Sequence, residues 1–130
     1  NMEDQKRVAS KHKTKTASVK SSIPYDFEFT NHNGYVPQLG ATKICYIHIE
    51  GLNYGGNFMT IDAKLSVVDA TNSVPCLVDA VRCCKLAQDR GIGGVLLSAS
   101  AYYCKFPPEQ HPDDEARRRL EEFIAGKRER

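Results

Sequence analysis

Four lysines stand at positions that suggest chemistry rather than plain solvation. Lys105 lies in "SASAYYCKFPPEQHPDD", after two tyrosines and a cysteine and two residues before a double proline. Lys11 and Lys15 are one helical turn apart, so both could point at one object. Lys43 opens a segment rich in β-branched residues. Ammonium groups that converge repel each other and lower the pKa of at least one. Together they could bind a phosphate, stabilise an oxyanion or transfer a proton.

Each candidate also has a simpler interpretation, which the residues alone leave open. Lys11 and Lys15 could belong to a solvated basic helix or a nucleic-acid arm, because residues 1–20 hold six Lys or Arg against two acidic residues. Lys43 could be a surface residue at a strand start, and Lys105 could extend past the tyrosines to water. Asp69, after an alternating segment, is a common turn or helix-start residue.

Other kinds of site are excluded by what the sequence lacks. It contains no nucleophile elbow, P-loop or metal signature, and "GIGG" (91–94) lacks the spacing of a dinucleotide fingerprint. The five cysteines show no CxxC spacing, which predicts free thiols in a reducing compartment, the cytoplasm. Cys45 and His48 have no second pair with which to hold zinc, so no metal site is predicted. No apolar run approaches the roughly 20 residues of a membrane helix.

The elements that must position these residues predict an α+β fold with a mainly antiparallel sheet. "TKICYIHIE" and "FMTIDAKLSVVD" flank a glycine-rich turn and are typical of a β-hairpin, whose second strand alternates as a half-buried strand does. At 130 residues the chain is one domain by length. In chain order we expect a basic helix within 1–20, an irregular connection over 21–40, strands over 42–50 and 58–69, a helix ending at 89–91, a short buried element over 91–105 and a helix over 112–125.

The two later helices carry predicted start signals and apolar faces. For the first, Asn72 or Ser73 is the predicted cap and Pro75 falls in the first turn. Its predicted inner face consists of Leu77, Val78, Val81 and Cys84 or Lys85. The predicted apolar stripe of the last helix consists of Ala116, Leu120, Phe123 and Ile124.

Several long blocks of the chain resemble one enzyme family. "DAVRCCKLAQDRGIGG" and "SASAYYCKFPPEQHPDD", together with "YVPQLGATKICYIHIEG", "AKLSVVDATNS" and "SKHKTKTASV", are similar in sequence and order to inositol-1-phosphate synthases of the archaeal and actinobacterial type. The resemblance covers nearly all of residues 1–126. It implies that residues 1–130 are the catalytic and oligomerisation domain, with helices on one face of a mainly antiparallel or mixed sheet, and that this domain accompanies a Rossmann NAD-binding domain.

The resemblance also implies a reaction. Such enzymes isomerise D-glucose 6-phosphate to 1L-myo-inositol 1-phosphate with tightly held NAD, through oxidation, enolisation, intramolecular aldol cyclisation and reduction, and so serve inositol and phospholipid biosynthesis. They are homotetramers, and a divalent or monovalent cation is a further cofactor candidate. By match to the family's motifs, the resemblance implies that the catalytic residues are Lys11, Lys15, Lys43 and Lys105. It implies that the substrate is bound by Lys15 and Lys43, and also by Asn1 and Met2 of a substrate loop. It places Asp69 near the nicotinamide. On this basis we expect Lys105 to be buried.

Two departures from the family pattern shape the expectations. Ala41 stands where the family has an aspartate, so a carboxylate near Lys43 is expected to be missing. The family's NAD-binding domain lies mostly upstream of residue 1, so we expect a fragment that is inactive alone. The alternative of a different class is a non-catalytic, synthase-related module that binds sugar phosphates or serves assembly. A nucleic-acid-binding module ranks third, because no aromatic residues interleave with the basic stretch.

Overall fold

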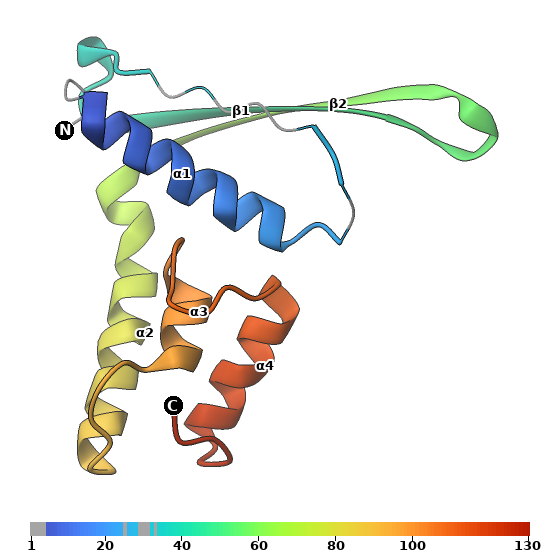
Figure 1. The fold of residues 1–130 in the computed structure, drawn as a ribbon. Helices are drawn as coiled ribbons and strands as arrows, with labels where there is room; N and C mark the ends of the chain where they lie inside the picture. Colours follow the sequence, from blue (N-terminus) through green and yellow to red (C-terminus); the bar gives the residue numbers. More distant parts are fainter. Residues whose placement is uncertain (1–4, 25, 29–31, 33) are drawn as a thin grey trace. The chain divides into compact units, whose positions relative to one another are not determined.

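The computed structural model describes residues 5–130 except 25, 29–31 and 33, and this part contains four α-helices and a two-stranded antiparallel sheet. The predicted α+β class is therefore confirmed (Figure 1). Two compact units form: residues Val36–Pro75, called the hairpin unit here, and the rest of the described chain, called the helical unit. In order, the elements are α1 (Gln5–Ser21), a 3₁₀ turn (Pro37–Leu39), β1 (Thr42–Leu52), a second 3₁₀ turn (Tyr54–Gly56), β2 (Phe58–Val68), α2 (Asp69–Asp89), α3 (Leu97–Tyr103) and α4 (Asp113–Ile124).

The predicted β-hairpin is confirmed along its whole length. The two strands pair without a bulge, from Thr42 opposite Val68 to Leu52 opposite Phe58. At the turn, the Asn53 amide donates to the Asn57 carbonyl at 2.9 Å. Gly55 and Gly56 have φ of 82° and 75°, a region that residues with a Cβ avoid. The glycine-rich segment therefore closes the hairpin as its composition predicts.

One face of this hairpin is almost entirely apolar. Because side chains alternate along paired strands, the register fixes which residues share a face. We call this set the apolar hairpin face: Cys45, Ile47, Ile49, Met59, Ile61, Ala63 and Leu65. Its large members are 40% (Met59) to 55% (Leu65) exposed. The alternation thus correctly predicts the second strand. The described residues of the chain do not, however, bury this face of it as expected.

Helix α2 follows β2 with no intervening loop, so the predicted cap at Asn72 or Ser73 is wrong. Asp69 is already helical, and the hydroxyl of Ser73 donates to the Ala70 carbonyl at 2.8 Å, inside the helix. Pro75 lies within the helix rather than in its first turn. Because proline has no N–H, it cannot give the usual helical hydrogen bond to the carbonyl of Thr71.

The predicted inner face of α2 is also wrong. Cys83 and Ala87 are the buried residues, whereas Leu77, Val78 and Val81 are exposed. The helix has two apolar faces, and the small residues rather than the large ones lie against α3 and α4. The size of the apolar residues in the sequence therefore does not indicate which face of α2 packs.

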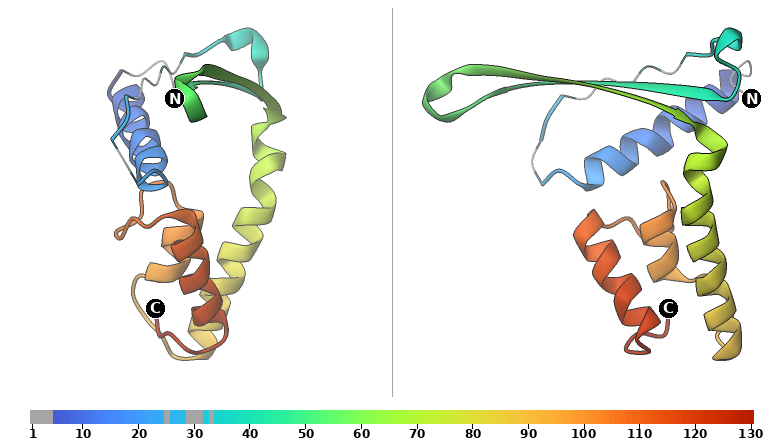
Figure 2. Two further views of the ribbon diagram at one scale, coloured as in Figure 1. Left: turned by 90° about the vertical axis from the view of Figure 1, so that its right-hand side faces the viewer. Right: turned by 180° about the vertical axis from the view of Figure 1, so that it is seen from behind.

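The core of the helical unit joins α2, α3 and α4, with α3 and α4 on the same side of α2 (Figures 1 and 2). Phe123 of α4 is fully buried, while Ile124 is 50% exposed, so the predicted stripe is confirmed except at Ile124. The guanidinium of Arg90, after α2, donates to the Phe123 and Ile124 carbonyls at 2.5 and 2.8 Å. Arg90 thereby adds a side-chain donor at the C-terminal end of α4, where the Phe123 carbonyl also accepts from the Gly126 amide at 3.1 Å. The buried members of the core are Cys83, Ala87, Ala99, Leu120 and Phe123.

Candidate functional site

Lys43 and Asp69 meet where the hairpin joins α2. The Lys43 ammonium donates to the Asp69 carboxylate, with 2.9 Å between Nζ and Oδ1. The Asp69 amide donates to the Ala41 carbonyl at 3.2 Å, which extends the strand pairing by one step and fixes where Asp69 lies. Both side chains remain largely exposed, so the pair can reach a ligand.

This pair corrects the expectation that Lys43 lacks a carboxylate. Asp69 supplies one directly opposite Ala41, the position at which the family aspartate is absent. The strand register contains the signal: if residue 42 pairs with residue 68, residue 69 must lie beside residue 41. Motif matching treated the two positions separately and missed it.

Lys11 and Lys15 lie on α1, and their spacing places them on one side of it, as predicted. Lys11 is exposed and Lys15 is half-buried. The Thr14 hydroxyl donates to the Lys11 carbonyl at 3.0 Å. A helix advances 100° per residue, so Lys13, two residues from each of them, faces the other side of α1.

Lys105 lies in the segment between α3 and α4, and its side chain is exposed. The expectation of a buried lysine is therefore wrong for this chain, although Pro107, two residues later, is buried. The segment contacts α1: the Lys13 ammonium lies 5.6 Å from the centre of the Phe106 ring, a cation–π distance. Sequence analysis missed this contact, which no motif indicates.

Thus the structure brings Asp69 to Lys43 in the hairpin unit, and the Lys105 segment to α1 in the helical unit. Convergence of all four lysines stays a prediction. Asn1 and Met2 lie outside the described residues. Cys45 and His48, three apart on β1, face opposite sides of the hairpin, which agrees with rejecting them as a zinc pair. Within the described residues, no three His, Cys, Asp or Glu side chains are arranged to hold a metal ion.

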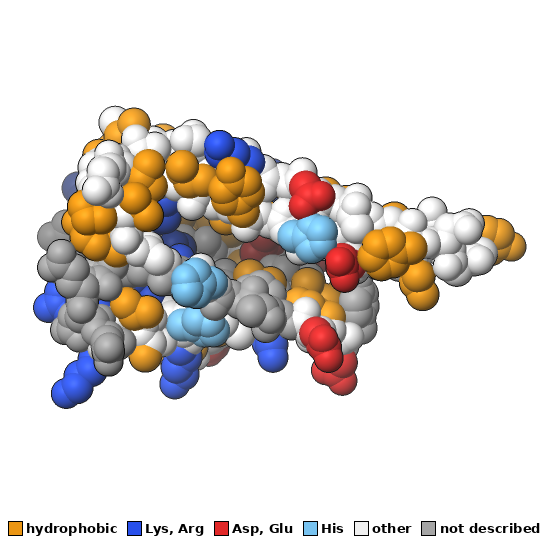
Figure 3. Space-filling model, turned by 90° about the horizontal axis from the view of Figure 1, so that it is seen from above, with side chains coloured by type: hydrophobic (Ala, Val, Ile, Leu, Met, Phe, Trp, Pro, Cys, Tyr) orange, Lys and Arg blue, Asp and Glu red, His pale blue; other side chains and the backbone are white. Residues whose placement is uncertain are grey.

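A histidine between two carboxylates marks the second, more polar hairpin face. His48 Nδ1 lies 2.6 Å from the Asp62 carboxylate on β2, and Nε2 lies 3.1 Å from the Glu50 carboxylate. Figure 3, which looks at the molecule from above, shows histidine and acidic side chains next to one another on this side. The hydrogen bond with Asp62, followed by that with Glu50, raises the pKa of His48 above its ordinary value. The two carboxylates contact different nitrogens of the ring, Asp62 at Nδ1 and Glu50 at Nε2. A metal ion bound to one of these nitrogens could therefore not be bound by both carboxylates as well. The group stabilises an imidazolium instead.

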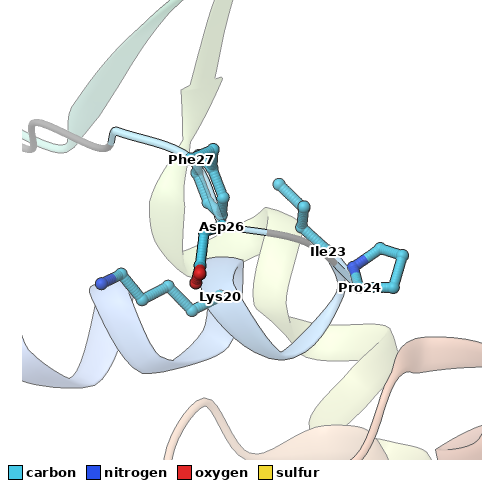
Figure 4. A pocket seen from close by; sticks show the side chains of 5 residues that line it. All are labelled: Lys20, Ile23, Pro24, Asp26 and Phe27. Atoms are coloured by element: carbon cyan, nitrogen blue, oxygen red, sulfur yellow. The ribbon is translucent and has the colours of Figure 1, made fainter.

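A shallow hollow of about 340 Å³ lies just beyond the end of α1. It is lined by Lys20, Ile23, Pro24, Asp26 and Phe27, and Figure 4 shows the Asp26 carboxylate turned toward α1. None of the family-matched residues lines it, so we assign it no part in the candidate site. No helix in the described part of the chain is long and apolar enough to cross a membrane.

Comparison with known proteins gives consistent matches. The family model described as "Myo-inositol-1-phosphate synthase" matches residues 1–70. The inositol-3-phosphate synthase of Mycobacterium tuberculosis is 44% identical over 130 residues, which cover 97% of this chain and 35% of the relative. That of Corynebacterium glutamicum is 45% identical over 133 residues, covering 95% and 37%. That of Mycolicibacterium smegmatis is 41% identical over 134 residues, covering 97% and 37%. The chain thus spans about a third of the length of these curated relatives.

Proposed function

Because this chain belongs to the myo-inositol-1-phosphate synthase family, we propose that it is the catalytic and oligomerisation part of an enzyme that isomerises D-glucose 6-phosphate to 1L-myo-inositol 1-phosphate. The same compound is named 1D-myo-inositol 3-phosphate when numbered in the other direction, which accounts for the two family names. The observation that carries the proposal is the Lys43–Asp69 ion pair, at two positions matched to the family's site.

We assign to this pair the stabilisation of negative charge on substrate oxygens. Enolisation beside a ketone and closure of the ring onto an aldehyde both place negative charge on oxygen, and a preorganised ammonium stabilises that charge. Asp69 holds the Lys43 ammonium in one place through the hydrogen bond between them. In this role it takes over from the aspartate that Ala41 replaces, so the departure at Ala41 leaves the lysine with a carboxylate partner.

The remaining family lysines belong to the proposal by match to the family's motifs. Lys11 and Lys15 present two cations on one side of α1, an arrangement suited to the phosphate of glucose 6-phosphate. Lys105 is placed on a segment held to α1 by Phe106 and by Gln110, whose amide donates to the Ser21 hydroxyl at 3.3 Å. We assign Lys105 to proton transfer or oxyanion binding.

Asp69 is the one family-matched residue of this chain that we assign to NAD. The Asp69 carboxylate is exposed beside Lys43, and we place the nicotinamide near it. NAD, when bound, would accept and return a hydride at carbon 5 of the sugar. "GIGG" (91–94) joins two helices instead of following a strand, so it is not the phosphate cradle of a dinucleotide site. We therefore propose that NAD is held mainly by a Rossmann domain, in cis or in trans, and we assign no cation ligand.

We further propose a homotetramer in the cytoplasm, in which residues 1–130 act as one catalytic and oligomerisation domain. The apolar hairpin face supports this, because it consists of large side chains that remain 40–55% exposed. Contiguous apolar surface of this kind marks protein interfaces. A neighbouring copy would cover it.

The test is a chimera in which this chain replaces the aligned segment of the Mycobacterium tuberculosis relative. With glucose 6-phosphate and NAD, we expect it to make inositol phosphate, whereas the 130 residues alone should show no turnover. Lys43→Ala and Lys105→Ala should each lower kcat about 10²–10³-fold, as removal of one oxyanion donor does. Lys127→Ala, an exposed lysine outside the site, is the matched control and should leave kcat unchanged.

The second candidate, a non-catalytic relative, is favoured by Ala41. It predicts that the folded chimera binds NAD and glucose 6-phosphate but makes no product, and that Ala41→Asp restores turnover. Product from the unmodified chimera would exclude this candidate.

A further inference from the structure

The segment that carries Lys105 joins α3 to α4 and is attached at both of its ends. We call residues 104–112 the α3–α4 linker. At its start, the Cys104 amide donates to a carbonyl of α3 at 2.9 Å. Near its end, the Arg119 guanidinium of α4 donates to the Glu109 carboxylate at 3.3 Å. These contacts fix the ends of the linker, and the part between them is held by a different element.

Two side-chain contacts hold the α3–α4 linker to α1. The Lys13 ammonium lies 5.6 Å from the centre of the Phe106 ring, within the distance at which a cation is attracted to an aromatic ring. Further along, the Gln110 amide donates to the Ser21 hydroxyl at 3.3 Å. The helix and the linker, which are about ninety residues apart in the chain, are thus joined at two points.

Because these two contacts are well separated on α1, they restrain the linker in more than one way. Lys13 and Ser21 are eight residues apart, which corresponds to about 12 Å along the helix. A single contact would leave the linker free to swing about it, whereas two contacts oppose both swinging and sliding along α1. Phe106 is the contact residue next to Lys105, so it has the most influence on where that lysine lies.

The contact at Phe106 uses a lysine that the substrate does not need in the proposed function. Lys11 and Lys15 lie on one side of α1, and Lys13 faces the other side. Lys13 can therefore bind the linker while the pair stays available to a phosphate. An aromatic ring also suits this place, because it carries no net charge and so does not compete with a phosphate for the ammonium groups of α1, as a carboxylate would.

We propose that Lys13 and Phe106 are positioning residues for Lys105. Their contact holds the α3–α4 linker against α1 and so fixes the distance between Lys105 and the helix that carries Lys11 and Lys15. Neither positioning residue touches the substrate in this assignment. The inference rests on the proposed function, because that function gives Lys105 its role in proton transfer or oxyanion binding. The contact itself does not depend on that role, so the two are tested separately.

The contact is tested in the 130-residue chain by NMR. The ring current of an aromatic side chain shifts protons above the ring upfield, so the ε-methylene protons of Lys13 should resonate upfield of those of Lys20, an exposed lysine of the same helix. Phe106→Leu should abolish this difference, and Phe106→Tyr, which keeps a ring, should preserve it. Equal resonances for Lys13 and Lys20 in the unmodified chain would overturn the proposal.

The consequence for catalysis is tested in the chimera with the Mycobacterium tuberculosis relative. Phe106 is 55% exposed, and an exposed cation–π contact shifts the population of the attached linker about 2–5-fold. Phe106→Leu and Lys13→Gln should therefore each lower kcat about 2–5-fold and leave the KM for glucose 6-phosphate unchanged. The double substitution should lower kcat no further, because both changes remove one contact.

Conservative and control variants separate positioning from a general effect of charge. Lys13→Arg should keep the kcat of the parent chimera, because a guanidinium also binds the face of a ring. Lys20→Gln removes a charge from the same helix and should leave kcat and KM unchanged. A rise in KM for Lys13→Gln that Phe106→Leu does not share would make Lys13 a phosphate contact and overturn positioning. Additive losses in the double substitution would overturn it as well.

Failure of the contact and failure of the proposed function have different signatures. An upfield-shifted Lys13 resonance, together with absence of product from the parent chimera, would support the attachment of the linker and reject the synthase reaction. Product from the parent chimera, together with an unshifted Lys13 resonance and an unchanged kcat in both single variants, would do the reverse.

Discussion

The hairpin unit and the helical unit both have regular backbone hydrogen bonding, but they differ in how far their apolar side chains are buried. In the hairpin unit every residue of the strands is paired, yet none of the described residues is fully buried. In the helical unit α2, α3 and α4 enclose a core around Phe123, which has no exposed surface. Regular hydrogen bonding and burial are therefore separable, and only one of the two units has both.

The difference has an energetic meaning. A two-stranded hairpin is only marginally stable in water, because its backbone hydrogen bonds replace bonds to water at little net gain. The helical unit gains from buried apolar area, the dominant favourable term in folding. We therefore expect the helical unit to keep its structure alone and the hairpin to depend on what covers its apolar face.

The largest expected effect is a break in the core of the helical unit. Phe123→Ala should lower the free energy of unfolding by about 3–5 kcal/mol, because it removes a buried ring and leaves a cavity. Thermal or urea unfolding followed by circular dichroism measures the loss. Ile124→Ala, one residue away and 50% exposed, is the control and should cost far less. Equal losses at the two positions would contradict the packing of α4.

An intermediate effect is expected at the apolar hairpin face. Ile47→Lys should weaken assembly at least about tenfold, since burial of one such side chain contributes roughly 1.5–3 kcal/mol. Sedimentation velocity of the chimera over a range of concentrations measures the change. Thr60→Lys puts the same charge on the opposite face of the hairpin and serves as the control. Unchanged assembly in the Ile47 variant would show that the face is not the interface.

The smallest expected effect concerns the polar face of the same hairpin. The pKa of His48 is raised in the folded state, mainly by its hydrogen bond with Asp62. Its stabilising contribution is therefore complete below the unfolded pKa of about 6.5 and is lost as pH rises through the folded value. The NMR titration of the His48 ring should have a midpoint above 6.5, and Asp62→Asn should lower it. A midpoint at or below 6.5 in the unmodified chain would contradict the ion pair.

Local patterns in the sequence predict most of the elements but not their surroundings. Richness in β-branched residues predicts the first strand, alternation predicts the second, and the glycines of the turn predict the hairpin. The start of α2 is missed, because Asn72 and Ser73 are good caps in isolation while the strand leads directly into a helix at Asp69. The inner face of α2 is missed because both of its sides are apolar, and which one packs depends on residues far away in the chain.

The candidate site shows the same limit. Motifs locate Lys43 and Asp69 separately, and only the strand register shows that they form one ion pair. The exposure of Lys105 could not be deduced from its apolar neighbours, because Tyr102 and Phe106 are themselves 45% and 55% exposed. Apolar residues in a segment predict that it is buried only where another helix or strand packs against that segment.

Pro75 gives α2 a point of mechanical compliance. The helix carries Asp69 at its first residue and the exposed Leu77 further along, and the missing hydrogen bond at residue 75 lies between them. A helix bends most easily where its hydrogen-bond ladder is interrupted. We therefore expect any bend of α2 to occur near Pro75, which would leave the first turn of the helix, and with it the ion pair between Asp69 and Lys43, unchanged.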